Sequence, residues 1–317
     1  MEFYVKKTIE MSQQEVQLLL NLFNKVFEKD RTLEVMLNQY TNNPLGYSYH
    51  SFFTDDGAIQ GAITYIPAYY YYGDERKVFV NSVDTMIAKE YRDAYELLEL
   101  IDSGYQTMKD DGVSLVYGYP NDKSFPVYMK SKTMNSIGKM RTFCLPFRIG
   151  GIKKSLSALN FLSEAFAFCY VGISTLFAGT KEAYFFIHKD DSSYNQTRYK
   201  RSDGQYGVAE LEDFKLYYKI REQENVRTAF IIDIDKKSAR NFCKAVRYLL
   251  RNERKSFDLI LYPGVLPFLT TGMIRIPVKY EPKNFHFTAK ILDKSLDKDK
   301  VLNIDNWDTN LSNYDLI

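Results

Sequence analysis

The stretch VFVNSVDTMIAKEYRDAYELLELIDSGYQTMKDDGVSLVYGYPNDKSFPVYMK, residues Val78–Lys130, decides the fold. Its first ten residues, Val78–Ile87, are mainly β-branched, aromatic or polar, a composition that favours an extended strand. After a short turn, apolar side chains recur at the spacing of an amphipathic helix, which we predict over Tyr95–Asp110. A short apolar strand at residues 114–119 and a second helix from about Ser124 follow. The stretch therefore predicts strand, helix, strand and helix in succession.

The start of the first predicted helix is a candidate anion site. The N–H groups of a first helical turn have no partner within the helix, and the helix dipole favours negative charge there. A strand, such a helix start and a second strand together are a common way to hold a diphosphate. The stretch is therefore compatible with a ligand that carries a pyrophosphate.

The residues that follow this site resemble the acyl-CoA motif of the GNAT superfamily of N-acyltransferases. Asn121, Ser124, Tyr128 and Lys130 keep the spacing of the second half of that motif, N-x-x-A-x-x-x-Y-x-K. The run Gly118–Asn121, GYPN, is similar to the GFPN of a bacterial tandem-GNAT subgroup. The second half of the motif is thus matched closely.

The first half of the motif, R/Q-x-x-G-x-G/A, is matched only in part. Arg92 stands at its first basic position, whereas Tyr95 and Leu97 replace the Gly and the Gly/Ala. Glycine at these positions lets backbone amides approach a pyrophosphate closely, and a larger side chain crowds it. The resemblance in fold is therefore stronger than the resemblance in the phosphate loop.

The resemblance implies acetyl-CoA or another acyl-CoA as co-substrate, and no metal. Tyr128 would act as the general acid, because a phenol with a pKa of about 10 can protonate a departing thiolate. Asp84, on the central strand, would be the general base, directly or through water; the alternative is a structural carboxylate bonded to a neighbouring loop. The residues that would bind acyl-CoA are Thr85, Met86, Ile87, Arg92, Asp93, Ala94, Tyr95, Glu96, Leu97, Asn121 and Ser124.

Composition argues against several other functions. The formal charge of +2 comes from 42 basic and 40 acidic residues, so no nucleic-acid-binding surface is indicated. The three cysteines and three histidines are scattered and match no metal or redox spacing, and we interpret the cysteines as buried, reduced thiols. Met1–Lys6 lacks the apolar core of a signal peptide, which favours a cytoplasmic protein.

The order of predicted elements indicates two domains. We predict an α/β (α+β) fold with two tandem GNAT-type domains, each a mixed, mostly antiparallel sheet flanked by helices. The N-terminal domain covers residues 1–150, and a degenerate C-terminal domain covers residues 181–317, where a similar order of strands and helices recurs. Within the latter we expect a loop over residues 190–205 and a short helix at Pro267–Thr271.

The apolar segment of residues 151–180 lies between the two predicted domains. Glu164 and several small residues argue against a membrane span, which needs about 20 apolar residues with almost no charge. We therefore expect a buried interdomain helical segment. A peripheral membrane contact is the alternative.

The favoured function is transfer of an acyl group, such as acetyl, from acyl-CoA to a small-molecule amine. Analogy with the tandem bacterial group suggests an amino sugar in surface-polysaccharide biosynthesis as acceptor. Two alternatives remain: a catalytically silent GNAT-fold binding or scaffold protein, which Tyr95 and Leu97 favour, and a Fem-type aminoacyl transferase, which would use aminoacyl-tRNA. No nucleic acid and no membrane are expected as partners, and the sequence does not predict the oligomeric state.

Overall fold

The chain forms two compact units, each assembled from separate segments of the sequence. The computed structural model describes residues 1–92, 94–199, 206–223 and 225–314. Unit 1 comprises Met1–Lys139, Phe186–Gly204 and Phe285–Trp307, and unit 2 comprises Met140–Phe185, Gln205–Asn284 and Asp308–Ile317. Each unit thus includes chain from both halves of the sequence, whereas the sequence analysis expects contiguous ranges.

Unit 1 is built on a mixed, mostly antiparallel sheet. Its strands are β1 (Glu2–Lys7), β2 (Tyr49–Asp55), β3 (Ala58–Tyr72), β4 (Glu75–Ile87), β5 (Leu115–Gly118) and β13 (Phe285–Ile291), in that spatial order. Among the described strands of this unit, β4 and β5 are the pair that runs in parallel, and helix α3 (Ala94–Asp110) connects them. The short strand β7 (Ile187–Lys189) pairs with the end of β3. The predicted strand–helix–strand succession is therefore confirmed.

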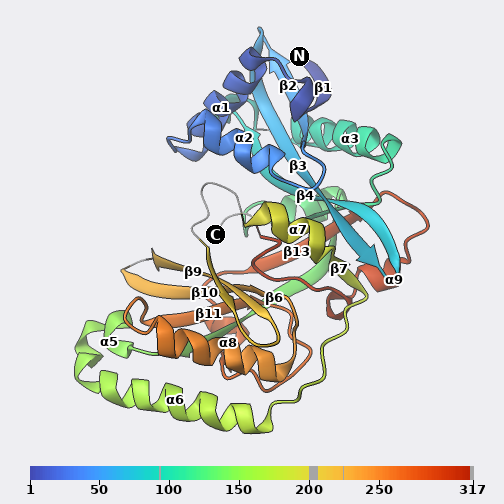
Figure 1. Cartoon of the computed structure of the whole chain (residues 1–317). Coiled ribbons are helices and arrows are strands. Elements are labelled where there is room, and N and C mark those ends of the chain that lie inside the picture. Colours follow the sequence, from blue (N-terminus) through green and yellow to red (C-terminus); the bar gives the residue numbers. More distant parts are fainter. Residues whose placement is uncertain (93, 200–205, 224, 315–317) are drawn as a thin grey trace. The chain divides into compact units, whose positions relative to one another are not determined.

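Helices cover both faces of this sheet (Figure 1). Helices α1 (Gln13–Phe27) and α2 (Leu33–Thr41) pack on one face, and α3 packs on the other. Successive strand residues point to opposite faces, so Phe52 packs with α1 and α2 while Phe53 packs with α3. The remaining helical elements of unit 1 are α4 (Phe125–Ser131), α7 (Asp191–Arg198), α9 (Lys298–Val301) and 3-10 turns at Thr8–Glu10, Lys89–Tyr91 and Ile304–Asn306.

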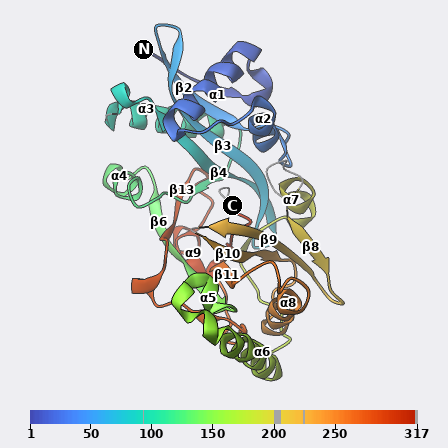
Figure 2. The same cartoon turned by 90° about the vertical axis from the view of Figure 1, so that its left-hand side faces the viewer.

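Unit 2 repeats the same local design. Its sheet has the spatial order β6 (Asn135–Pro146, of which Met140–Pro146 belongs to this unit), β11 (Leu259–Gly264), β10 (Val226–Ile234), β9 (Lys215–Gln223) and β8 (Gly207–Glu210), and β12 (Ile274–Arg275) also pairs with β6. In the part of unit 2 that the structure describes, β10 and β11 are the strand pair that runs in parallel, and helix α8 (Ala239–Asn252) connects them. Helices α5 (Ile149–Ile152) and α6 (Asn160–Phe177) and 3-10 turns at Lys154–Leu159 and Val278–Tyr280 complete the unit. Helix α6 runs beside α8 (Figure 2).

Several local predictions are wrong. The segment of residues 151–180, expected to be a buried interdomain helix, contains helix α6 with most of its large apolar side chains exposed. The reason is that only a narrow stripe of the helix, Ser163, Ala167, Val171 and Ser174, is buried against unit 2. The region 190–205, expected to be a loop, includes helix α7, which Asp190 caps with a hydrogen bond from the backbone of Ser192. No helix forms at Pro267–Thr271, and Cys169 is exposed rather than buried.

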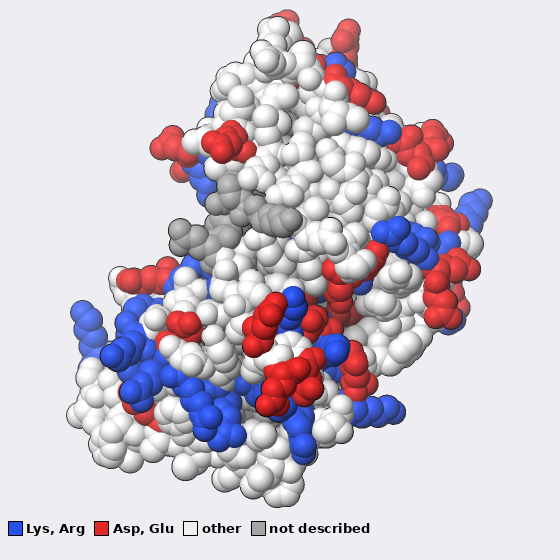
Figure 3. Space-filling view, viewed as in Figure 1, with Lys and Arg blue, Asp and Glu red and all other residues white. Residues whose placement is uncertain are grey.

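The near-balanced charge of the whole chain hides a difference between the units. Unit 1 contains 22 basic and 26 acidic residues, whereas unit 2 contains 20 basic and 14 acidic residues, which gives formal charges of −4 and +6. On the face seen in Figure 3, Lys and Arg side chains gather over elements of unit 2. Unit 2 is therefore the basic part of the protein.

Candidate functional site

The central strand of unit 1 carries a β-bulge at the residues that the sequence motif points to. Thr64 of β3 pairs with Val83 of β4, but Ala62 pairs with Met86, so that Asp84 and Thr85 together oppose a single β3 residue. Asp84 adopts a left-handed backbone conformation with φ of 48°. Asp tolerates this conformation better than most residues do. The bulge bends β4 and changes the direction of the side chains beyond it.

Beyond this bulge β4 has lost its parallel neighbour. In the part of the chain that the structure describes, β4 pairs with β5 only from Phe79 to Ser82, opposite Leu115–Gly118. Strand β4 itself continues to Ile87 and keeps its pairing with β3 on the other edge. The β5-side edge of Val83–Ile87 therefore offers main-chain N–H and C=O groups to an extended ligand, as a sheet edge does in strand addition.

Helix α4 brings the predicted acid to this edge. The Tyr128 hydroxyl lies 3.2 Å from the Thr85 Oγ1 atom on the bulge. The Tyr128 ring is buried in the cluster between α3 and the sheet, and this burial raises the pKa of its phenol above the ordinary value. The phenol is therefore protonated at neutral pH and placed as a proton donor beside β4.

Asn121 and Ser124 shape the start of α4. The Asn121 Oδ1 atom accepts hydrogen bonds from the backbone N–H of Lys123 at 3.0 Å and of Ser124 at 2.9 Å, and from the Ser124 hydroxyl at 3.1 Å. This is an Asx turn, in which an Asn side chain accepts hydrogen bonds from the backbone of the residues just after it. These two residues position α4, and through it Tyr128.

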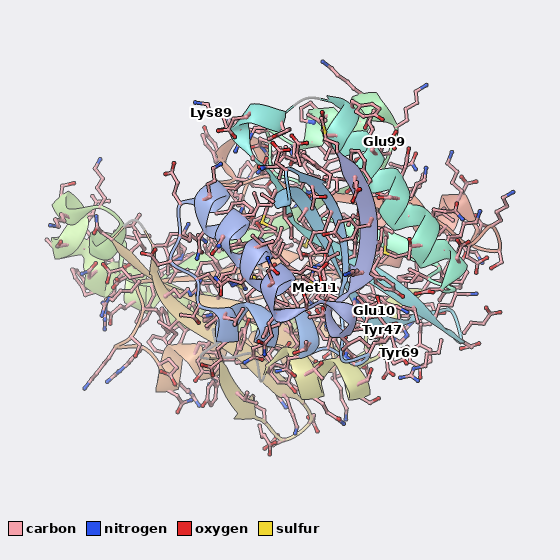
Figure 4. All side chains as sticks on the ribbon, turned by 90° about the horizontal axis from the view of Figure 1, so that it is seen from above. Glu10, Met11, Tyr47, Tyr69, Lys89 and Glu99 are labelled. Atoms are coloured by element: carbon pink, nitrogen blue, oxygen red, sulfur yellow. The ribbon has the colours of Figure 1, made fainter. Side chains whose placement is uncertain are left out.

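The start of α3 lies close to the end of β4. The Arg92 Nε atom donates a hydrogen bond of 3.0 Å to the carbonyl oxygen of Ile87, and α3 begins at Ala94. Asp93 lies outside the described residues. In Figure 4, Lys89 marks the turn before α3 and Glu99 marks the helix itself. The first-turn amides of α3 therefore start just beyond the β4 edge.

Tyr95 and Leu97 point in different directions from the first turn of α3. The Tyr95 side chain is 60% exposed and its ring lies edge-on to Phe3 of β1, with 6.3 Å between the ring centres. Leu97 packs against the buried cluster between α3 and the sheet, and Glu96 is buried as well. Tyr95 is thus directed to β1 and solvent, whereas Leu97 contributes to the core.

Asp84 is held by two partners from the helical face of unit 1. Its Oδ2 atom accepts a hydrogen bond of 2.8 Å from the Tyr40 hydroxyl and lies 3.6 Å from an Arg31 guanidinium nitrogen. Both charged side chains are largely buried, and the Arg31 guanidinium also lies over the rings of Phe23 and Tyr40. The carboxylate therefore links the α1–α2 connection to the bulge. Met86, at the end of the bulge, is buried in the hydrophobic cluster that α1 and α2 form with the sheet.

Comparison with known proteins identifies the fold. No family model and no curated protein sequence matches the chain. A conserved protein of unknown function from Enterococcus faecalis, described as a probable N-acyltransferase, superposes with a TM-score of 0.60 at 13% identity, over 92% of this chain and 73% of that one. A GCN5-related N-acetyltransferase from Anabaena variabilis gives 0.58 at 13% identity, over 91% and 73% of the two chains. Eis1 from Mycobacterium abscessus gives 0.57 at 10% identity, over 92% and 74%. The fold is that of the GNAT N-acyltransferases.

In unit 2 the parallel strands β10 and β11, which correspond to β4 and β5 of unit 1, also part from each other, but another segment of the chain lies at the edge of β11 that is freed. Within the described residues, β10 and β11 pair at Thr228–Phe230 with Leu259–Leu261 and no further. Beyond that point Gly264 of β11 pairs with β6 on one edge and with Asn310 on the other, and the Val265 N–H donates to the Thr309 carbonyl oxygen at 3.0 Å. Thr309 and Asn310 therefore lie at the edge of β11 that faces β10.

Buried charges fix this segment in unit 2. The Lys237 Nζ atom lies 2.7 Å from Asp233 Oδ1 and 2.8 Å from Asp308 Oδ2, and the Asn310 amide donates to Asp233 at 2.8 Å. All four side chains are buried. The corresponding edge of unit 2 is therefore covered by Thr309 and Asn310, whereas among the described residues of unit 1 no strand pairs with the β5-side edge of β4 beyond Ser82. This difference favours unit 1 for the candidate site.

Sequence reasoning did not find every residue of this site. Arg31 and Tyr40 lie far from Asp84 in sequence and in no motif with it, so only the packing of α1 and α2 on the sheet reveals them. The described residues contain no group of three or more His, Cys, Asp and Glu side chains that could hold a metal ion.

Proposed function

We propose that this protein is an N-acyltransferase that transfers acetyl or another acyl group from acyl-CoA to the amine of a small molecule. The observation that supports this most directly is the contact between Tyr128 and Thr85 at the bulge of β4, where β4 parts from β5 within a GNAT fold. The bulge and the open strand edge fit an extended pantetheine arm, and the first turn of α3 fits a pyrophosphate.

In this proposal the residues of the chain assist a direct transfer. The amine nitrogen attacks the thioester carbonyl carbon, so that a C–N bond forms and the C–S bond breaks. The amine loses one proton to a base or to water, and the CoA thiolate receives one proton from Tyr128. The backbone of Thr85 to Ile87 holds the pantetheine, the amides of α3 hold the pyrophosphate, and Arg92 supplies positive charge beside them.

Asp84 has two possible roles in this scheme. Its contacts with Arg31 and Tyr40 favour a carboxylate that holds the bulge in shape, and a water molecule would be needed to connect it to the amine. We therefore propose Asp84 as a positioning residue for Thr85, and through Thr85 for Tyr128. Its removal then lowers stability and activity together, whereas loss of a base lowers activity alone.

Acetyl-CoA binding is the first test of this function. Isothermal titration of the full chain with acetyl-CoA at up to about 1 mM covers the usual range of substrate affinity. The proposal expects one site per chain, and absence of heat or of any thermal stabilisation at that concentration contradicts it.

The acceptor is tested by release of free CoA thiol in the presence of different amines. We favour an amino sugar, by analogy with tandem bacterial GNAT proteins. The panel therefore contains amino sugars, simple alkyl amines and amino acids, with the corresponding hydroxy compounds as matched controls. Turnover only with amines other than amino sugars refutes the proposal that the acceptor is an amino sugar, but it still supports acyltransferase activity.

A silent GNAT-fold binding protein is the second candidate. The observation that favours it is the first turn of α3, which has Tyr95 and Leu97 where glycines are usual and where Leu97 packs into the core. Acetyl-CoA binding without thiol release for any amine supports this candidate, and release supports the enzyme.

A further inference from the structure

Helix α6 exposes an apolar surface that the proposed acyl transfer does not use. Residues Lys154–Phe177 are long and apolar enough to cross a membrane by length and composition. Leu176 and Phe177 are 78% and 77% exposed. The other large apolar residues exposed along this helix are Phe161, Leu162, Phe166, Phe168 and Ile173. Such a contiguous apolar patch on a folded unit marks an interaction site more often than a chance arrangement.

The opposite side of α6 is fixed to unit 2. Ala167 and Val171 belong to the hydrophobic core of this unit, and the Ser163 hydroxyl donates to the Phe147 carbonyl oxygen at 2.8 Å. The one acidic residue of the helix, Glu164, accepts a hydrogen bond of 2.8 Å from the Arg148 Nε atom. A membrane span would break these contacts, so the helix lies along the surface of its unit with its single negative charge paired.

Cationic side chains border this apolar surface. Helix α8, which packs beside α6, has four basic residues and no acidic one, and its Arg240, Arg247 and Arg251 are exposed. These three arginines form no ion pair among the described residues, whereas Lys244 pairs with Glu212 and Asp213. Lys153, Lys154 and Lys181 flank the ends of α6 and are exposed too. In Figure 3 blue side chains stand over this part of unit 2.

We propose that the exposed face of α6, with the arginines of α8 beside it, is a docking surface for an anionic lipid bilayer. An amphipathic helix of this kind lies in the interface with its apolar side chains at the level of the acyl chains, and neighbouring Arg and Lys side chains contact anionic headgroups. The formal charge of +6 on unit 2 supports attraction to such a surface.

The positive charge beside α6 also favours an anionic bilayer over a second copy of the chain as the partner of this surface. In a two-fold symmetric dimer the same patch meets itself, which would bring the arginines of one α8 toward those of the other. Like charges at an interface oppose association. An anionic bilayer instead complements both the apolar face and its cationic border.

Flotation of the full chain with lipid vesicles tests the proposal independently of any enzymatic activity. The vesicles contain phosphatidylcholine with about 30% phosphatidylglycerol, or phosphatidylcholine alone as the neutral reference. We expect at least about tenfold stronger binding to the anionic vesicles, and a large loss of that binding at about 0.5 M salt. Equal or absent binding to both kinds of vesicle overturns the proposal.

Two variants and one control define the surface. Leu176→Glu with Phe177→Glu, and separately Arg247→Glu with Arg251→Glu, change exposed side chains only and should reduce vesicle binding by at least about tenfold. Ile9→Glu changes an apolar residue of unit 1 that is 69% exposed and should leave binding unchanged. Circular dichroism checks the fold of each variant. Wild-type binding by both double variants, or light scattering that shows a dimer dissolved by Leu176→Glu with Phe177→Glu, refutes the lipid assignment.

Discussion

Replacement of Tyr128 by Phe separates a catalytic role of its hydroxyl from a packing role of its ring. The ring is buried in the cluster between α3 and the sheet, and Phe keeps this burial almost entirely. The substitution removes the 3.2 Å hydrogen bond between the Tyr128 and Thr85 hydroxyls, and such a bond contributes about 1 kcal/mol to stability. A general acid contributes about 10² to 10⁴ to the rate, which corresponds to about 3 to 5 kcal/mol in the barrier.

The expected result for Tyr128→Phe is therefore a kcat at least about a hundredfold lower, with the free energy of unfolding reduced by about 1 kcal/mol or less. Thiol release with the best amine of the panel gives kcat and KM, and urea unfolding gives the stability. Tyr105→Phe, in the same buried cluster but on α3, is the matched control and should keep kcat within about threefold. A kcat of Tyr128→Phe within about threefold of wild type refutes the acid role.

The pH dependence gives a second measure of the same hydroxyl. Burial raises the pKa of Tyr128 above its ordinary value of 10.0, so the phenol remains protonated throughout the neutral and mildly alkaline range. The wild-type rate should accordingly show no loss of activity from this group below about pH 10. A decline of kcat with an apparent pKa well below that value, absent in Tyr128→Phe, would contradict the reasoning.

Three further predictions concern unit 1. Burial lowers the pKa of His50 to about 3 from an ordinary 6.5, so the unfolded chain binds more protons below pH 6.5 and stability falls as the pH decreases. The free energy of unfolding should drop by about 2 kcal/mol from about pH 7 to pH 5, and His50→Gln should abolish this part of the difference in urea titrations. Asp84→Asn leaves the largely buried Arg31 without its carboxylate and should cost about 3 kcal/mol; a loss below about 0.5 kcal/mol would show that the pair is not structural. Tyr95→Gly removes a side chain that points to β1 and solvent, so the Kd for acetyl-CoA should change by less than about threefold. A tenfold lower Kd would mean that Tyr95 obstructs the phosphate site. Leu97→Gly is unsuitable for this test, because it opens the core at a cost of about 3 kcal/mol.

The sequence by itself determined the local elements and the fold class. The period of apolar residues over Tyr95–Asp110 predicts α3, and the structure has this helix at Ala94–Asp110. The start of α1 is likewise local, since the capping box there is formed by Ser12 and Glu15, three residues apart in the chain. The predicted α/β fold with mostly antiparallel sheets flanked by helices is confirmed. These features depend on residues close together in the chain, and their periodicity is therefore visible in the sequence.

Only the tertiary structure decided how distant segments combine. Strand β13 completes the sheet of unit 1 and β6 enters that of unit 2, because an alternating pattern specifies which face of a strand is buried but not which strand is its neighbour. The same holds for the partners of Asp84, which reach it only when α1 and α2 pack on the sheet. Hydropathy correctly predicted that α6 is an apolar helix, but the prediction that the helix is buried is wrong. One narrow stripe of residues is enough to fix α6 to unit 2, and this leaves the larger side chains at the surface.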